Sequence, residues 1–268
     1  MAIEVFSRYE KKYLIDDSTY RYIIDSISDH MVPDKYSKNG EFYNIANIYY
    51  DTPDDALIRA SIEKPVYKEK LRLRSYGVPE LDDKVFLEIK KKYKGLVNKR
   101  RTKLKLCEAY DLTMDGIYPE IQDYMNPQVL SEIEYFLKMY ELQPKVYLTY
   151  DRRAYFATDD SDFRVTFDTN IKSRRTDVRL EMGNHGDLLI GNDVWLMEVK
   201  SSMAVPLWFT EILSNAKVYA TSFSKYGTEY KKHLIREKQL KGEDLLCLPT
   251  FLRQQQVQQY PIHQCLSV

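Results

Sequence analysis

The sequence predicts an α+β fold: an antiparallel β-barrel whose charged interior forms a tunnel, flanked by α-helices. Two observations favour it. Many segments alternate charged and apolar residues with the two-residue period of a strand, whereas few show the apolar spacing of a helix. The 23 tyrosines among 268 residues are also typical of strands with half-polar surfaces. Few helices among many strands indicate an α+β or barrel architecture.

Three segments have the apolar spacing of helices that pack on a sheet. The first is Asp16–Met31, where Asp16 or Asp17 can cap the N-terminus. The second is Pro127–Tyr140, and the third begins near Pro206, because proline is favoured in the first helical turn. We expect all three to cover the apolar face of the sheet.

The clearest strand pattern lies in Tyr67–Tyr76, which has leucines on one face and four cations on the other. The cations are Lys68, Lys70, Arg72 and Arg74. The segment Val85–Lys90 places Phe86, Glu88 and Lys90 on one face. After a turn at Lys94-Gly95, cations alternate again at Lys99, Arg101, Lys103 and Lys105. These segments predict a hairpin with cations on both arms.

Three further segments repeat this pattern. Their charged or polar faces carry Arg164, Thr166 and Asp168; Glu198 and Lys200; and Arg8, Glu10 and Lys12. A solvated sheet face explains any one of these strands, because antiparallel sheets often expose one face to water. Repeated like charges across a sheet are destabilising, however, so we expect an anion to compensate them. If the sheet closes into a barrel with its charged faces inside, the ligand that best fits this interior is a polyphosphate.

Three glutamates stand two residues before a cation of the same face: Glu10, Glu88 and Glu198. Carboxylate oxygens of this kind suit Mg²⁺ or Mn²⁺, which bind through one or two carboxylates and the phosphates of the substrate. Ordinary ion pairing along each strand is the alternative. Glu198 is the main candidate for a metal ligand, and Glu10 and Glu88 are the others.

Composition and the absence of known motifs argue against several other classes of function. Forty basic residues balance forty acidic ones, so no overall field favours nucleic acid or an anionic membrane. No phosphate-binding loop, dinucleotide fingerprint, zinc-protease motif or serine-hydrolase motif occurs. Cys107, Cys247 and Cys265 have no metal-ligand spacing and are odd in number, which favours a reducing compartment. With no signal peptide and no apolar span, we expect a cytoplasmic protein without direct membrane insertion.

Short motifs that include these residues occur in the order and spacing of a known family, across residues 6–230. The chain resembles the catalytic VTC (vacuolar transporter chaperone) domain, a polyphosphate polymerase of the triphosphate tunnel metalloenzyme (CYTH-like) superfamily. The motifs are Arg8–Tyr13, Ile48–Thr52, Leu71–Gly77, Phe86–Lys90, Tyr150–Tyr155, Arg164–Asp168, Met197–Lys200 and Phe223–Tyr226. This places a VTC-like tunnel domain at residues 1–240 and a C-terminal tail at 241–268.

The resemblance implies a metal-dependent enzyme that binds ATP with Mn²⁺ or Mg²⁺ and passes the γ-phosphate to a growing polyphosphate chain. It implies catalytic roles for cations near the transferred group: Lys12, Arg72, Arg74, Lys90, Arg164 and Lys200. Other cations are expected to bind substrate: Arg8, Lys70, Lys99, Arg101, Arg152 and Lys225. Lys99 and Arg101 remain alternatives for the basic position after Gly95. Fungal members carry a further lysine where this chain has Ser222.

Fungal members also carry an SPX domain and transmembrane helices, which this sequence lacks. The resemblance is therefore to a stand-alone bacterial type, with a separate membrane partner left open. Three other functions stay open at this point. A tunnel triphosphatase would use the same residues with water as acceptor. A non-catalytic polyphosphate- or nucleotide-binding module would gain little from metal, and a nucleic-acid binder would lose affinity steeply with salt.

Overall fold

The structure is a computed structural model that describes residues 9–37, 40–94, 96–160 and 162–242. Arg8 and nearly all of the predicted tail lie outside these residues. The chain divides into two compact units, of which the first ends at Gly227 and the second begins at Thr228. The described part of the second unit consists of the rest of helix α6 and the turn after it.

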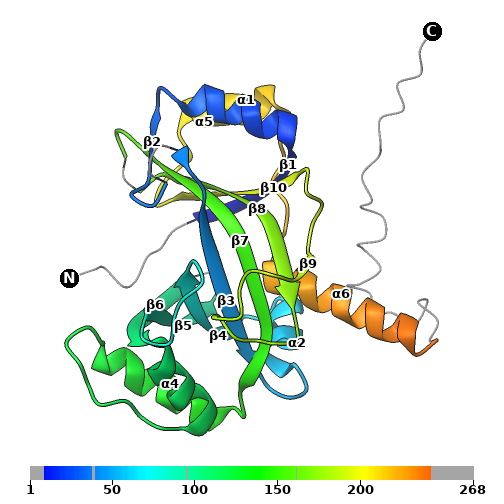
Figure 1. The fold of residues 1–268 in the computed structure, drawn as a ribbon. Helices are drawn as coiled ribbons and strands as arrows, with labels where there is room; N and C mark the ends of the chain where they lie inside the picture. Colours follow the sequence, from blue (N-terminus) through cyan, green and yellow to red (C-terminus); the bar gives the residue numbers. More distant parts are fainter. Residues whose placement is uncertain (1–8, 38–39, 95, 161, 243–268) are drawn as a thin grey trace. The chain divides into compact units, whose positions relative to one another are not determined.

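Within the described residues, ten strands form one antiparallel sheet (Figure 1). The main order is β1-β10-β8-β7-β3-β4-β5-β6, while β2 pairs with β7 and β9 pairs with β8. The strands are β1 (Tyr9–Asp16), β2 (Met31–Pro33), β3 (Tyr43–Asp51), β4 (Tyr67–Tyr76), β5 (Lys84–Tyr93), β6 (Leu96–Lys105), β7 (Gln143–Ala157), β8 (Arg164–Arg174), β9 (Asp187–Leu188) and β10 (Val194–Ser201). In the described part of the chain no backbone pairing joins β1 to β6, so the hydrogen-bonded sheet remains open between them.

The helices are α1 (Asp17–Ile27), α2 (Ala56–Ile62), α3 (Leu106–Tyr110), α4 (Pro127–Met139), α5 (Leu207–Asn215) and α6 (Lys225–Leu240), with a π-helical turn, η2 (Asp111–Asp115). Asp16 caps α1 by accepting the Thr19 N–H at 2.7 Å. The helix ends before the predicted Met31 because Met31 already pairs with β7 as the first residue of β2. Helices α4 and α5 lie where the apolar spacing places them.

Two apolar cores cover the outer face of the sheet. In the first, α1 and α5 pack on β1, β8 and β10, and Phe163, Phe167 and Phe209 are fully buried. In the second, α3 and α4 pack on β4 and β5, and Leu71 and Leu87 are fully buried. Burial of these faces drives the charged residues of alternate positions to the inner face. The strand alternation in the sequence is confirmed in both halves.

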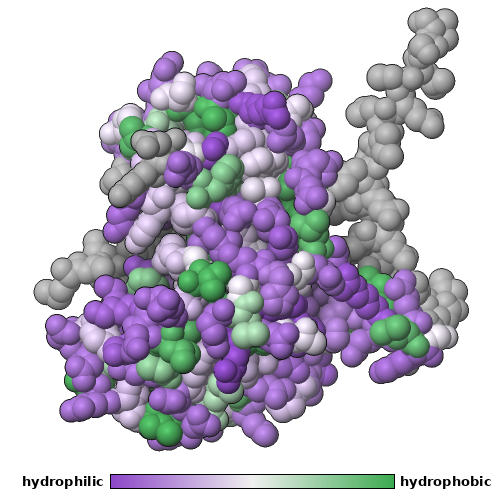
Figure 2. All heavy atoms as spheres, in the orientation of Figure 1, coloured by the Kyte–Doolittle hydropathy of each residue, from purple (hydrophilic) through white to green (hydrophobic). Residues whose placement is uncertain are grey.

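Hydrophilic residues predominate on the face in Figure 2, where hydrophobic residues form only small scattered patches. Among the described residues, the structure has no helix that is both long and apolar enough to cross a membrane.

Candidate active site

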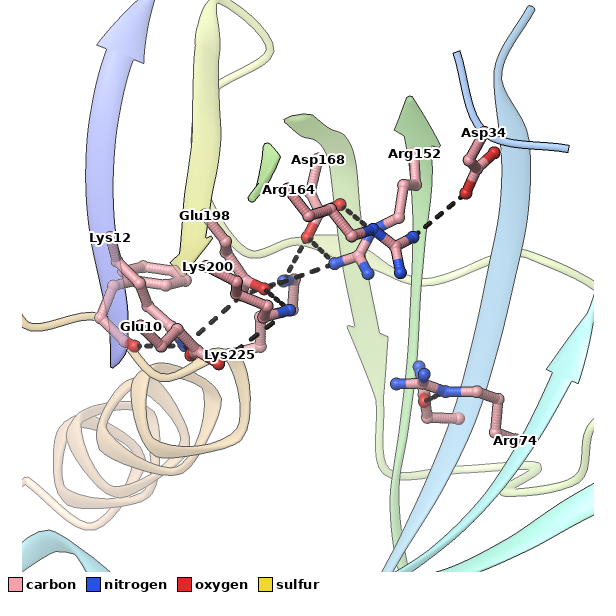
Figure 3. A network of polar contacts seen from close by, with 12 residues as sticks. Glu10, Lys12, Asp34, Arg74, Arg152, Arg164, Asp168, Glu198, Lys200 and Lys225 are labelled. Carbon is pink, nitrogen blue, oxygen red and sulfur yellow. Dashed lines mark hydrogen bonds and ion pairs between the residues drawn. The ribbon is translucent and has the colours of Figure 1, made fainter. Parts of the chain in front are cut away.

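Seven charged residues from four strands and the first turn of α6 form one group on the inner face, which we call the Glu198 cluster (Figure 3). Its members are Glu10, Lys12, Arg152, Asp168, Glu198, Lys200 and Lys225. Antiparallel pairing brings them together, because Lys12 lies opposite Glu198, and Glu10 lies opposite Lys200. The cluster is therefore a consequence of register as well as of strand alternation.

Glu198 lies at the centre of this cluster and is only 6% exposed. Its carboxylate is 3.2 Å from Lys200 Nζ, 3.4 Å from Lys12 Nζ and 3.5 Å from Lys225 Nζ. Burial alone would raise the pKa of Glu198, but these lysines and Arg152 hold it well below its usual range. Glu198 is therefore a carboxylate at neutral pH, and several cations compete for its two oxygens.

Asp168 orients two cations of the cluster. It accepts Arg152 Nε–H at 2.6 Å and a second Arg152 N–H at 2.7 Å, a bidentate pair, and Lys225 Nζ lies 2.5 Å from its Oδ2. Burial favours the neutral acid, but Arg152 and Lys225 lower the pKa of Asp168. The strand pattern predicts Asp168 on this face but assigns it no role in the site. Its parity with Arg164 was the available signal.

Arg164 approaches the cluster from β8 and is held by Asp34, whose carboxylate lies 3.1 Å from a terminal guanidinium nitrogen (Figure 3). Asp34 also accepts the hydroxyl of Tyr43 and two backbone N–H groups, so it is well fixed. Arg164 Nε and the hydroxyl of Thr166 are buried without a hydrogen-bond partner in the structure. Such donors are costly unless a ligand or water pairs with them.

A second group on the inner face, the Glu88 cluster, joins β4, β5 and β6. Its members are Lys70, Arg72, Arg74, Glu88, Lys90 and Lys99. Glu88, only 1% exposed, lies 2.6 Å from Arg72 Nε and 2.7 Å from Lys99 Nζ. Burial alone would raise the pKa of Glu88, but Arg72, Arg74 and Lys99 hold it well below its usual range. One carboxylate thus serves three cations.

The register of these strands arranges the inner face in rungs. Arg74, Phe86 and Lys103 are paired across the three strands; then Arg72, Glu88 and Arg101; then Lys70, Lys90 and Lys99. Adjacent rungs are two residues apart, or about 7 Å along the strand. Asn47 on β3 fixes the first rung, because its Oδ1 accepts Arg74 Nε–H at 3.0 Å. We call these three rows the ladder of cations, in which Glu88 is the one carboxylate.

The two clusters influence each other electrostatically. Burial lowers the pKa of Lys90. Lys12 and Lys200 from the other cluster also lower this pKa, whereas Glu10 raises it. Lys225 belongs to the Glu198 cluster, while the next residue, Tyr226, stacks on Tyr49 of β3 with ring centroids 4.7 Å apart. Strands from opposite ends of the sheet therefore contribute charges to one shared interior.

Cations outnumber carboxylates in this interior, and the lysine ammonium groups respond to the crowding. Burial lowers the pKa of Lys70 to about 8, aided by Lys68, Lys90 and Lys12. Burial also lowers the pKa of Lys99 to about 7, because Arg72 and Arg74 partly offset the effect of Glu88. For Tyr49, burial alone would raise the pKa, but Arg72, Lys70 and Arg74 lower it to about 8. A bound polyanion would relieve this crowding.

We therefore predict that binding of inorganic tripolyphosphate takes up a proton at Lys70. The pKa of Lys70 is about 8 in the free protein, and a bound polyanion raises it. Affinity should thus fall as pH rises above 8, by about tenfold per pH unit for this one proton. Isothermal titration calorimetry between pH 6.5 and 9.5, in buffers of different ionisation enthalpy, measures both the affinity and the proton uptake.

Lys70→Met supplies the control, because the ligand titrates identically with both proteins. The variant should bind more weakly at pH 6.5 and show a flatter decline above pH 8 than the unaltered protein. Equal slopes for the two proteins would contradict the role of Lys70.

Divalent metal ions suit part of this site. No group of three or more His, Cys, Asp or Glu residues with metal-binding geometry occurs among the residues the structure describes. Glu10 and Glu198 nevertheless share Lys12, whose Nζ lies 3.2 Å and 3.4 Å from their carboxylates. Burial and Glu198 oppose ionisation of Glu10, but Lys200, Lys12 and Lys90 lower its pKa. Two ionised carboxylates beside several cations fit the way Mg²⁺ binds with substrate phosphates.

Most predicted site residues that the structure describes lie in one of the two clusters. Arg164 lies beside the Glu198 cluster and pairs with Asp34, and Arg101 lies in neither cluster. Its side chain is exposed, and its guanidinium lies 4.6 Å from the centroid of the Phe86 ring. Lys99 instead contacts Glu88, with its Nζ 2.7 Å from the carboxylate. Arg8 lies outside the described residues, and Glu88 is placed among arginines and a lysine, apart from Glu10 and Glu198. Sequence reasoning missed Asp34 and Asn47, which hold Arg164 and Arg74.

Residues 7–234, most of the chain, match the VTC domain. The chain belongs to the VTC domain family. A relative of this VTC domain is the vacuolar transporter chaperone complex subunit 4 of Schizosaccharomyces pombe, which is 24% identical over 202 residues. That match covers 67% of the chain but 28% of the relative, so the chain spans little more than a quarter of that protein's length.

Solved structures resemble the VTC domain in fold at low identity. A candidate adenylate cyclase from Bacillus halodurans has a TM-score of 0.50 and 14% identity, over 83% of this chain and 96% of that one. A Hippeastrum protein described as having dominant triphosphatase activity has a TM-score of 0.45 and 14% identity, over 88% and 96% of the two chains. The similarity to the first of these structures confirms the predicted antiparallel tunnel fold with flanking helices. In the described part of this chain, however, the hydrogen-bonded sheet is open between β1 and β6.

Proposed function

We propose that this VTC domain is a polyphosphate polymerase that transfers the γ-phosphate of ATP to the end of an inorganic polyphosphate chain. One observation carries the proposal: cations outnumber carboxylates in both clusters on the inner face. Burial and the excess of positive charge lower the pKa of Lys99 to about 7 and that of Lys70 to about 8. A chain of phosphates supplies the missing negative charge. The reaction would take place wherever ATP is available, which we propose is the cytoplasm.

In the proposed reaction, a terminal oxygen of polyphosphate attacks the γ-phosphorus of ATP, and the bond to the β-phosphate oxygen breaks to release ADP. Phosphoryl transfer of this kind needs no protein nucleophile, because positioning and charge stabilisation supply most of the catalysis. Arg72, Arg74 and Arg164 would hold phosphate oxygens. Lys12 and Lys90, which interact between the two clusters, would neutralise charge that develops near the γ-phosphate.

We propose Glu198 and Glu10 as the residues that would hold Mn²⁺ or Mg²⁺. Glu88 is the weaker candidate, because Arg72 and Lys99 already lie within 2.7 Å of its two oxygens. A divalent ion bound there would supply further positive charge to the phosphates of the substrate. Lys12 Nζ contacts the carboxylates of both glutamates. Its positive charge would keep both of them ionised.

The test is to incubate the purified protein with ATP and Mn²⁺, and to resolve the products by gel electrophoresis and phosphorus NMR. Long chains with internal phosphate resonances are the expected result. Orthophosphate as the main product would instead establish a triphosphatase, and unchanged ATP would overturn both enzyme readings for the isolated chain.

Neighbouring lysines on β1 provide a matched pair of variants for the same assay. Lys12 points to the inner face and contacts two glutamates, whereas Lys11 is exposed on the strand. Lys12→Met should lower the rate of product formation about a hundredfold, as loss of one well-placed cation does. Lys11→Met should leave the rate within about twofold. Equal rates for the two variants would argue against catalysis in this interior.

A further inference from the structure

A pocket outside both clusters lies at the edge of the sheet, beside β5, β6 and the segment before α4. Its volume is about 170 Å³, and its walls include Phe86, Arg101, Lys103, Tyr124 and Asn126. This is smaller than the ~300–1,000 Å³ of pockets that enclose drug-sized ligands. It suits a single planar ring system better than a whole nucleotide.

The walls of this pocket offer surfaces on which a planar ring can stack. The Arg101 guanidinium packs over Phe86, with its central carbon 4.6 Å from the ring centroid. Phe86 also meets Tyr76 edge-on, at 5.9 Å between centroids. One face of the Tyr124 ring is already covered, because Lys84 Nζ lies over it at 4.2 Å. Aromatic faces and arginine planes are the platforms on which proteins stack nucleobases.

The pocket is aligned with the ladder of cations. Phe86 pairs with Arg74 on one side and with Lys103 on the other, so it forms part of the first rung. The second rung holds Arg72, and the third holds Lys70, Lys90 and Lys99, about 7 Å further for each step. A ligand with its ring in the pocket would therefore direct a phosphate tail along the ladder.

We propose that this pocket holds the nucleobase of a nucleoside triphosphate, stacked on the wall formed by Phe86 and Arg101. The proposal rests on the proposed function, which it deepens by assigning the two ends of the substrate. With the base at the first rung, the γ-phosphate approaches the third. There Lys90 interacts with Glu10 and Lys12 of the Glu198 cluster, which is where the transfer is expected.

The experiment compares two ligands that share a triphosphate: a non-hydrolysable ATP analogue, and inorganic tripolyphosphate, which has no base. Dissociation constants are measured by calorimetry for the unaltered protein and for Phe86→Leu, which removes the ring but keeps an apolar side chain. The variant should bind the analogue about tenfold more weakly, as expected for loss of base stacking. Its affinity for tripolyphosphate should change less than twofold, which also establishes that it folds.

Tyr135→Leu is the matched control, because Tyr135 is 64% exposed on α4 and does not line the pocket. It should bind both ligands as the unaltered protein does. Equal weakening of both ligands by Phe86→Leu, or no weakening of either, would overturn the base pocket and leave the proposed function standing. If the unaltered protein binds neither ligand, the proposed function fails, and the base pocket fails with it.

Discussion

Replacing Glu198 by glutamine is expected to lower the rate of phosphoryl transfer at least a hundredfold while metal-free phosphate binding is kept or strengthened. The substitution preserves shape but removes the one charge that Lys12, Lys200 and Lys225 share. Those cations then have more charge to offer a polyphosphate. The site loses its central carboxylate, however, and with it the main candidate for holding a metal ion. Effects of one preorganised charged group on rate are typically about 10²–10³-fold.

Two measurements separate these effects: the initial rate of ADP release with Mn²⁺, and the dissociation constant for tripolyphosphate in the presence of a chelator. Glu211→Gln on α5 is the control, since that side chain is exposed on the outer layer. It should match the unaltered protein in both assays. A Glu198→Gln protein that retains the full rate of ADP release would refute a catalytic role for this carboxylate.

The parity of charges along each strand could be predicted because side chains alternate strictly between the two faces of a strand. Lys70, Arg72 and Arg74 all lie on the inner face as expected, and Leu71 and Leu73 are fully buried on the other. The limits of β4 also agree with the sequence pattern, Tyr67–Tyr76. Local periodicity is sufficient for these features, because each depends only on neighbours within one strand.

Contacts between distant strands could not be predicted in this way. Asp168 holds Arg152 and Lys225, and Asp34 holds Arg164, across sequence separations of 16, 57 and 130 residues. Register between strands also decides that Lys99 reaches Glu88 while Arg101 packs on Phe86. Strand alternation assigns both cations to the same face and cannot choose between them.

Helices α2, α3 and α6 also escaped the sequence analysis, and α3 has only five residues. Helix α2 has only seven residues, too few for a clear apolar period. Helix α6 carries charged residues over much of its length, so its sequence shows no clear apolar stripe. Its first residue, Lys225, was identified by family resemblance alone, which gave the residue its expected role without the helix that positions it.

Asp168→Asn is expected to cause the largest loss of stability among the changes considered, about 3–5 kcal/mol in the free energy of unfolding. Asp168 is fully buried, and it pairs with both Arg152 and Lys225. The neutral amide leaves two buried cations near each other, with Glu198 as their remaining partner in the cluster at 3.5–3.7 Å. Removing one member of a buried charge network costs far more than removing an exposed ion pair.

Urea unfolding at pH 7 measures this loss, with Glu134→Gln as the control because its pair with Lys138 is exposed on α4. That control should cost no more than about 0.5 kcal/mol. Saturating tripolyphosphate should restore more stability to Asp168→Asn than to the unaltered protein, since the ligand supplies the charge that Asp168 gave up. Two outcomes would contradict the dependence of Arg152 and Lys225 on the charge of Asp168. One is a variant with normal stability, and the other is a variant that tripolyphosphate stabilises no more than it stabilises the unaltered protein. A larger gain would instead show that the carboxylate and the substrate phosphates compensate the same cations, which is the physical basis proposed for binding in this interior.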